Sequence, residues 1–169
     1  MAAEAIRGDT QAVLDAIRRI VQALRESSRW AERHVGLTGA QLFILQKIAE
    51  SPAVSINGLA ERTHTHQSSV STVVSRLVAQ GFVRRVLSAT DARRVELSLA
   101  ARGQRVIDRA PDAAQERLIR GVERLSPTRR RHLAISLGEL ALAVNDVDGA
   151  PAMFFEERRG RRKGRTRHD

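Results

Sequence analysis

Apolar residues recur at helical spacing along the first fifty positions. One apolar stripe predicts a helix over residues 10–34, which Gly36 ends. Thr38 and Gln41 have the spacing of a capping box, so a second helix begins after Thr38. Ser51-Pro52 ends this second helix, because the residue before a proline is pushed out of the helical conformation. The stripe of the first helix consists of Val13, Ile17, Ile20, Val21 and Leu24.

Two shorter helices follow, and the second has an unusual composition. Ser55 is the expected cap of a helix through residue 63. Residues 64–81 read HTHQSSVSTVVSRLVAQG, and Gly81 is expected to end this helix in a left-handed conformation. Ser, Thr and Val are poor helix formers, so tertiary packing must stabilise this helix. Its apolar positions nevertheless share one helical face: Val70, Val73, Val74 and Leu77.

The hydrophobic pattern then changes to a period of two. Residues 82–87 and 93–99 predict two strands, with SATDA as the turn between them. Val95, Leu97 and Leu99 lie on one face of the second strand. Two short helices joined by a turn and followed by a hairpin describe a winged helix-turn-helix. The predicted fold class is therefore mainly α with a small β-hairpin wing.

The helical period returns after Gly103 and continues to about residue 145. Pro111 lies inside this pattern and predicts a kink or break near residues 107–111, because proline in a helix interior costs roughly 3 kcal/mol. Ser126 and Pro127 predict the cap and first position of a last helix. Beyond Val147 the periodicity ends, so residues 148–169 are expected to be a basic, disordered tail with Met153–Phe155 as a docking point. The apolar face of the last helix consists of Leu133, Leu137, Leu140, Ala141 and Val144.

The charge of the chain favours a polyanionic partner. Its 29 Lys and Arg residues exceed 19 acidic residues, which gives a net charge of +10. A chain this basic favours nucleic acid as its partner. The absence of cysteine excludes disulfides and thiolate metal sites. Neither a signal peptide nor a long apolar run is apparent, so the expected location is the cytoplasm, without a membrane partner.

Three stretches form a recognisable set: LTGAQLFIL, INGLAERTHTHQSSVSTVVSRLVAQGFVRR and the wing signature D-x-R…L-x-x-x-G in TDARRVELSLAARG. Together they resemble the MarR (multiple antibiotic resistance regulator) family of bacterial winged-helix transcription regulators. Asp91 and Arg93 occupy the acidic and arginine positions of that signature. Two positions depart from the family pattern. Ala100 stands where a capping Thr is common, and Thr72 stands where the recognition helix often has Arg.

The resemblance implies a domain organisation and a function. Residues 37–103 would form the DNA-binding lobe, and residues 10–34 and 104–145 would form a homodimer. The dimer would bind a pseudo-palindromic operator of double-stranded DNA as a transcription repressor. A small, often aromatic or phenolic, ligand between the dimer helices and the lobe would release it. One alternative is a constitutive architectural DNA-binding protein without an inducer, and another is a winged-helix adaptor that binds protein.

The candidate DNA-binding residues carry the chemistry of groove and phosphate contacts. Gln pairs with adenine, and Ser or Thr reaches base edges or phosphates. Wing arginines suit the minor groove and the phosphates, and Asp91 would hold an arginine in place. A solvated polar face is the alternative interpretation. The candidates on the helix are His66, Gln67, Ser68, Ser69, Ser71, Thr72, Ser75 and Arg76, and those on the wing are Arg84, Arg85, Asp91, Arg93 and Arg94.

The remaining candidate sites are weaker. Trp30, His34 and Phe43 are candidate walls of a ligand pocket, although Trp30 is more typical of a dimer core and Phe43 of a protein core. His64-x-His66 has no third metal ligand at suitable spacing, so we expect no metal and no cofactor. No nucleophile motif, phosphate loop or acid pair beside a histidine is present, so we expect no enzyme activity.

Overall fold

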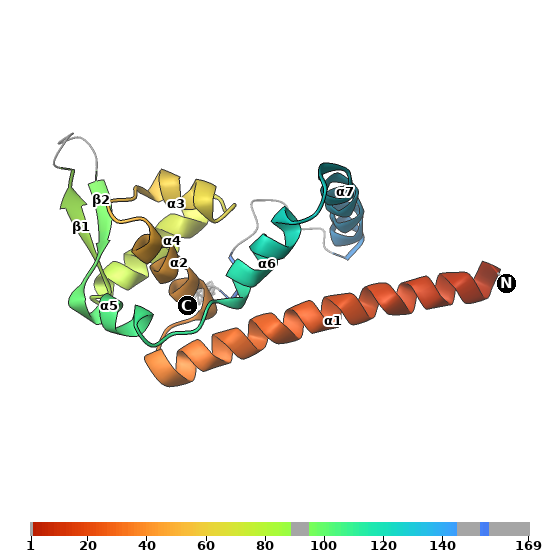
Figure 1. The fold of residues 1–169 in the computed structure, drawn as a ribbon, viewed down its shortest axis with the longest axis horizontal. Coiled ribbons are helices and arrows are strands. Elements are labelled where there is room, and N and C mark those ends of the chain that lie inside the picture. Colours follow the sequence, from red (N-terminus) through yellow and green to blue (C-terminus); the bar gives the residue numbers. More distant parts are fainter. Residues whose placement is uncertain (1, 89–94, 145–152, 156–169) are drawn as a thin grey trace, which may run out of the picture.

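The computed structural model describes residues 2–88, 95–144 and 153–155 of the 169-residue chain (Figure 1). Within these residues, helices dominate and two antiparallel strands form the only sheet. This arrangement confirms the predicted mainly α fold with a hairpin. The elements in chain order are α1 (Ala2–Val35), α2 (Gly39–Glu50), α3 (Ile56–Arg62), α4 (Gln67–Ala79), β1 (Val83–Leu87), β2 (Val95–Leu99), α5 (Ala101–Ile107), α6 (Ala114–Glu123) and α7 (Pro127–Val144).

Helix α1 is longer than its apolar stripe predicted. It begins at Ala2 rather than near residue 10, and Gly36 ends it with a φ of +68°. The first residues are rich in Ala and Glu, which favour helix without needing a buried face. The amino-terminal half of α1 projects well beyond the rest of the molecule (Figure 1).

Side-chain caps begin the next two helices as predicted. The Thr38 hydroxyl accepts from the Gln41 amide at 3.2 Å, and the Gln41 side-chain oxygen accepts from the Thr38 amide at 2.9 Å. The Ser55 hydroxyl accepts from the Gly58 amide at 3.1 Å and caps α3. These bonds satisfy amides that have no partner inside their own helices.

Helix α2 is the centre of the winged lobe. It contacts α1, α3, α4, α5 and β2, and most of its residues are buried. Against it packs the apolar face of α4, in which Val70, Val73, Val74 and Leu77 are at most 1% exposed. Helix α4 is thus stabilised by packing, which its poor intrinsic propensity required. Gly81 follows α4 with a φ of +74°, as expected.

The wing pairs β1 with β2 from Val83↔Leu99 to Leu87↔Val95. Leu97 is buried and also bridges to Val54, whereas Val95 is 46% exposed. On the face of the second strand that was expected to point inward, Leu97 therefore packs in the core, whereas Val95, nearer the tip of the hairpin, is exposed to solvent. Asp91, Arg93 and Arg94 lie outside the described residues.

A break separates α5 from α6, as Pro111 predicted. Helix α5 ends at Ile107 and α6 begins at Ala114. The side chain of Gln46 on α2 spans the break, since it donates to the Pro111 carbonyl at 2.9 Å and accepts from the Ala113 amide at 3.0 Å. These two bonds replace the helical bonds that the break removes.

Helix α7 stands away from the winged lobe in Figure 1. Its first turn is capped by Ser126, whose hydroxyl accepts from the Arg129 amide at 3.4 Å. None of its residues is buried within the single chain. Among the described helices, α7 included, we find no stretch with the length and apolarity needed to cross a membrane.

Candidate DNA-binding surface and ligand cavity

The outer face of α4 presents the polar residues that the sequence singled out. His66, the first residue of this surface, occupies the N-cap position without a side-chain capping bond. His66, Gln67, Ser68, Thr72 and Ser75 are exposed, while Ser69, Ser71 and Arg76 are half-buried. The face opposite the buried valines is therefore available to a partner and consists of short, hydrogen-bonding side chains.

Thr72 uses its hydroxyl hydrogen within the helix. Its Oγ1 donates to the Ser68 carbonyl at 3.1 Å. The hydroxyl oxygen keeps its capacity to accept, and its methyl group remains beside it on the exposed side chain. The exposed side of Thr72 can therefore accept a hydrogen bond and make an apolar contact, whereas an arginine at this position would donate.

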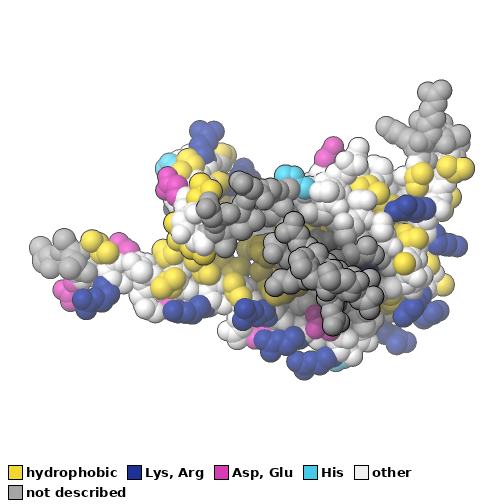
Figure 2. Space-filling model, turned by 180° about the vertical axis from the view of Figure 1, so that it is seen from behind, with side chains coloured by type: hydrophobic (Ala, Val, Ile, Leu, Met, Phe, Trp, Pro, Cys, Tyr) yellow, Lys and Arg dark blue, Asp and Glu magenta, His cyan; other side chains and the backbone are white. Residues whose placement is uncertain are grey.

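The wing and α4 are joined by an arginine. Arg85 Nη2 donates to the Ser75 hydroxyl at 3.2 Å, and Arg84 Nη2 donates to the Leu99 carbonyl at 3.4 Å. Both arginines are exposed, so their charge faces solvent beside the polar surface of α4. Lys and Arg side chains line this edge of the lobe, below the wing (Figure 2).

Arg102 belongs to the same lobe and was not predicted. Its Nη1 donates to the Gln80 carbonyl at 2.9 Å, and its guanidinium lies 4.2 Å from the centre of the Phe82 ring. The side chain thus supports the carboxyl end of α4 and adds positive charge near the wing. No sequence pattern indicated this contact, because the whole hairpin separates Arg102 from Gln80.

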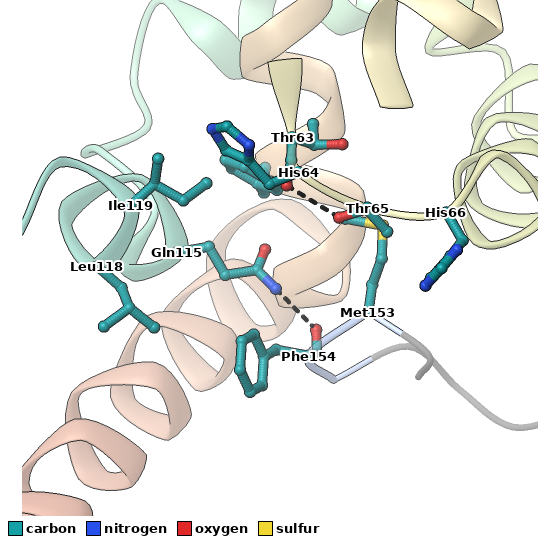
Figure 3. Close-up of a pocket in the computed structure, with 10 residues that line it drawn as sticks. Thr63, His64, Thr65, His66, Gln115, Leu118, Ile119, Met153 and Phe154 are labelled. Atoms are coloured by element: carbon teal, nitrogen blue, oxygen red, sulfur yellow. Dashed lines mark hydrogen bonds between the residues drawn. The ribbon is translucent and has the colours of Figure 1, made fainter. Parts of the chain in front are cut away.

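A cavity of about 310 Å³ lies between α2, the turn from α3 to α4, and α6 (Figure 3). Residues 153 and 154 close another side, and Met153 is buried against the lobe. Met153–Phe155 had been expected as a docking point, and Met153 fulfils that expectation. The lining residues are Phe43, Thr63, His64, Thr65, His66, Gln115, Leu118, Ile119, Met153 and Phe154.

Only one of the three residues expected in a ligand pocket lines this cavity. Phe43 does, whereas Trp30 and His34 do not line this cavity, and their place in a ligand pocket stays a prediction. Trp30 packs on the core and its ring stacks on His34 at 4.8 Å, while His34 Nδ1 donates to the Trp30 carbonyl at 2.9 Å. Their one-turn spacing made the two residues neighbours, but the packing of α6 against α1 and α2 decided where the cavity lies.

The two histidines of the α3–α4 turn face different surroundings. His64 has a φ of +50°, and its Nε2 lies 3.5 Å from Glu123 Oε1 on α6. His66 caps α4. No three His, Asp or Glu side chains among the described residues are grouped as metal ligands.

A buried ion pair connects α2 of the lobe to α6. Lys47 Nζ lies 2.6 Å from Glu116 Oε2 and 2.9 Å from Glu50 Oε2, while Arg120 Nε donates to Glu116 Oε1 at 2.9 Å. Burial acts to raise the pKa of Glu116, but the hydrogen bonds from Lys47 and Arg120 outweigh it and lower the pKa below its ordinary value. Burial likewise opposes the charge of Lys47, and its two carboxylate partners raise its pKa instead. Both groups are therefore charged at neutral pH.

The helix-turn-helix and its paired strands define a winged-helix protein with a polar recognition helix. Residues 35–94 match the model of the MarR family, so this winged-helix lobe is similar to the members of that family.

Curated proteins with similar sequences are named as transcription repressors. The chain is 32% identical over 85 residues to the homoprotocatechuate degradative operon repressor of Escherichia coli, a match that covers 50% of this chain and 57% of that protein. An HTH-type transcriptional repressor of Mycobacterium tuberculosis is 27% identical over 122 residues, or 72% of this chain and 88% of the relative. The chain spans only a little over half the length of the E. coli repressor.

Solved structures share the fold. A MarR/EmrR family transcriptional regulator from Acinetobacter sp. ADP1 superposes with a TM-score of 0.54 at 19% identity, covering 82% of this chain and 98% of that one. The DNA complex of MepR from S. aureus gives a TM-score of 0.52 at 16% identity, with coverage of 79% and 94%. At these identities the likeness concerns the fold alone.

Proposed function

We propose that this chain is a homodimeric, sequence-specific transcription repressor that a small ligand releases from DNA. The observation that carries this proposal is the exposed polar face of α4, joined to the wing by the bond from Arg85 to Ser75. One continuous surface then offers short side chains for base edges and arginines for phosphates. The relatives named as repressors support the same function.

In this proposal α4 lies in the major groove. Gln67, Ser68 and Ser71 are placed to meet base edges, and Thr72 contributes an acceptor and a methyl group. Arg84 and Arg85 contact phosphates and fix the register of the lobe on the duplex. Arg93 and Arg94 complete the wing, where Arg93 reaches the minor groove and Asp91 positions an arginine.

The dimer would form through α1 and α7. Leu133, Leu137 and Leu140 on α7 are 38–47% exposed in the single chain, and Leu142 is 80% exposed. The projecting half of α1 likewise exposes Val13 at 49%. Apolar surface of this extent is unusual on a monomer and is covered when two copies pair.

The cavity is the proposed ligand site. It lies where the α3–α4 turn of the lobe meets α6, so a ligand there touches both the recognition unit and a helix of the dimerisation region. Its size falls in the range of small-molecule sites. An aromatic ligand fits the ring of Phe43 and the aliphatic walls.

The experiment is selection of DNA sites from a random pool, followed by titration of the selected duplex at physiological salt. We expect an inverted repeat with half-sites about one helical turn apart. Its affinity should exceed that for scrambled duplex by at least about 10³-fold. A ratio near one would favour the architectural alternative, and no DNA binding at all would favour the protein adaptor.

The architectural alternative is favoured by one observation, the charge of residues 156–169. This segment holds seven Lys or Arg against three acidic residues. If this segment dominated the affinity for DNA, deleting residues 156–169 would abolish most binding. The slope of log affinity against log salt concentration would then fall by several units. For the proposed repressor, we expect the deletion to weaken binding to the selected duplex and to the scrambled duplex about equally. The ratio of the two affinities should therefore be preserved.

A further inference from the structure

One wall of the cavity carries a buried amide with an unpaired oxygen. Gln115, near the start of α6, is 7% exposed. Its Nε2 donates to the Phe154 carbonyl at 3.3 Å. Its Oε1 has no hydrogen-bond partner among the residues that the structure describes. A carbonyl oxygen enclosed without a donor is unfavourable, because folding removes it from water without replacement.

The orientation of this amide is fixed by its neighbour. The two ends of a glutamine amide differ only in donating and accepting, so a turn of the group would exchange them. The Phe154 carbonyl can only accept, and it therefore holds the nitrogen end. Figure 3 shows the oxygen on the opposite side, turned towards the side of the cavity that holds Thr65 and His64.

The two hydroxyls that line the cavity cannot supply the missing donor. Thr65 Oγ1 donates to the Thr63 carbonyl at 2.9 Å, and Thr63 Oγ1 donates to the Leu59 carbonyl at 2.7 Å. Each hydroxyl has a single hydrogen, which these backbone bonds already use. The unpaired acceptor is therefore free to take a donor from a bound molecule.

The other walls define the body of a matching molecule. Phe43, Leu118, Ile119 and Met153 line the cavity with apolar surface. A flat, largely apolar molecule fills such a space, and a single hydroxyl group on it would meet the amide oxygen. A carboxylate at the same position would set two acceptors against each other, which is unfavourable in a buried site.

We propose that Gln115 determines ligand specificity in this cavity, with Oε1 accepting a hydrogen bond from the hydroxyl of a neutral, mainly apolar molecule. This inference rests on the proposed function, in which the cavity binds the releasing ligand. It adds the residue that selects the ligand and the group on the ligand that this residue recognises.

The test is calorimetric binding of three probes to the full chain at neutral pH. 2-Naphthol carries the hydroxyl, 2-methoxynaphthalene has the same rings without a donor, and 2-naphthoate is an anion. We expect 2-naphthol to bind about tenfold more tightly than its methyl ether, the difference that one buried hydrogen bond supplies. Gln115→Met preserves side-chain length and removes the acceptor, so it should bind both neutral probes equally. Gln104→Met, at an exposed position of α5, should bind like the unaltered chain.

The outcomes separate the two proposals. Equal binding of 2-naphthol and its ether to the unaltered chain overturns the role of Gln115, as does a preference that survives in Gln115→Met. Tighter binding of 2-naphthoate also overturns it and assigns the ligand to His64 and His66 at the rim. If no probe binds while the selected DNA still does, the ligand-controlled part of the proposed function fails and this inference fails with it, whereas the DNA-binding part stands.

Discussion

Gly103 shows how a single missing side chain positions a helix. A Cβ atom at this residue would collide with the carbonyl oxygen of Phe82, which accepts from the Ala100 amide at 2.9 Å. The first turn of α5 therefore lies directly against the start of the wing. This close approach also explains how α5 begins at Ala100, which provides no side-chain cap. Backbone contact holds the turn where the family often uses threonine.

Gly103→Ala should destabilise the lobe by about 2 to 4 kcal/mol, because backbone atoms of Phe82 would have to move. Gly121→Ala is the matched control. Gly121 lies in α6 with nothing within 4 Å of its added Cβ, so alanine should stabilise that helix by up to about 1 kcal/mol. Urea unfolding followed by circular dichroism measures both. Equal effects of the two substitutions would contradict the packing of α5 against the wing.

Arg85→Ala should weaken binding to every duplex by a similar factor, because a phosphate contact carries no sequence information. The slope of log affinity against log salt concentration should fall by about one, because one phosphate contact is lost. Arg29→Ala, an exposed arginine of α1, should leave both quantities unchanged. Fluorescence anisotropy at several salt concentrations measures the slope. An unaltered slope for Arg85→Ala would remove this residue from the DNA-binding surface.

At the scale of elements, the ion pair from Lys47 to Glu116 connects the lobe to α6. Both side chains are 11% exposed, and the pair stands beside Glu50 and Arg120. Buried ion pairs add little net stability over apolar packing, but removing one partner leaves the other charge uncompensated. The pair therefore fixes the angle at which α6 leaves the lobe, next to the proposed ligand cavity.

Glu116→Gln should lower the free energy of unfolding by about 1 to 3 kcal/mol at neutral pH. Because the folded-state pKa of Glu116 lies below its unfolded value, the ionised carboxylate stabilises the fold above about pH 4.3, and this contribution is lost as pH falls through the folded pKa. The difference between the unaltered chain and Glu116→Gln should therefore shrink in acid. Urea titrations across this range measure it, with the exposed Glu61→Gln as control. A difference that stays constant with pH would exclude this linkage.

The whole molecule has its core in one place and its uncovered apolar surface in another. The buried cluster lies in the winged lobe and the adjoining ends of α1 and α6, whereas α7 has no buried residue in the single chain. Apolar side chains are visible along α1 and α7 in Figure 2. A helix of this kind is stable only when another surface covers it.

Leu137→Arg should convert the proposed dimer to a monomer and weaken binding to an inverted repeat at least tenfold, because one half-site contributes alone. Glu139→Arg places the same side chain on the opposite side of α7 and should preserve the dimer. Sedimentation velocity gives the oligomeric state. A monomeric unaltered chain would contradict the proposed assembly, and a dimeric Leu137→Arg would exclude this face of α7 from its interface.

The sequence alone predicted the features that depend on local chemistry. Capping at Thr38 and Ser55, the turn at Gly81, the break at Pro111 and the buried face of α4 all follow from periodicity and from backbone restrictions on single residues. The same periodicity placed the polar face of α4 outward, opposite the valines.

Contacts between distant segments were decided only by the tertiary structure. No spacing rule relates Arg102 to Gln80, Lys47 to Glu116, or Gln115 to Phe154, because each pair is separated by at least one whole element. For the same reason, spacing along the chain did not locate the cavity at Phe43 and Gln115. Neighbours along one helix are visible in a sequence, whereas a cavity forms where several elements pack imperfectly, and that position depends on the packing of the whole lobe.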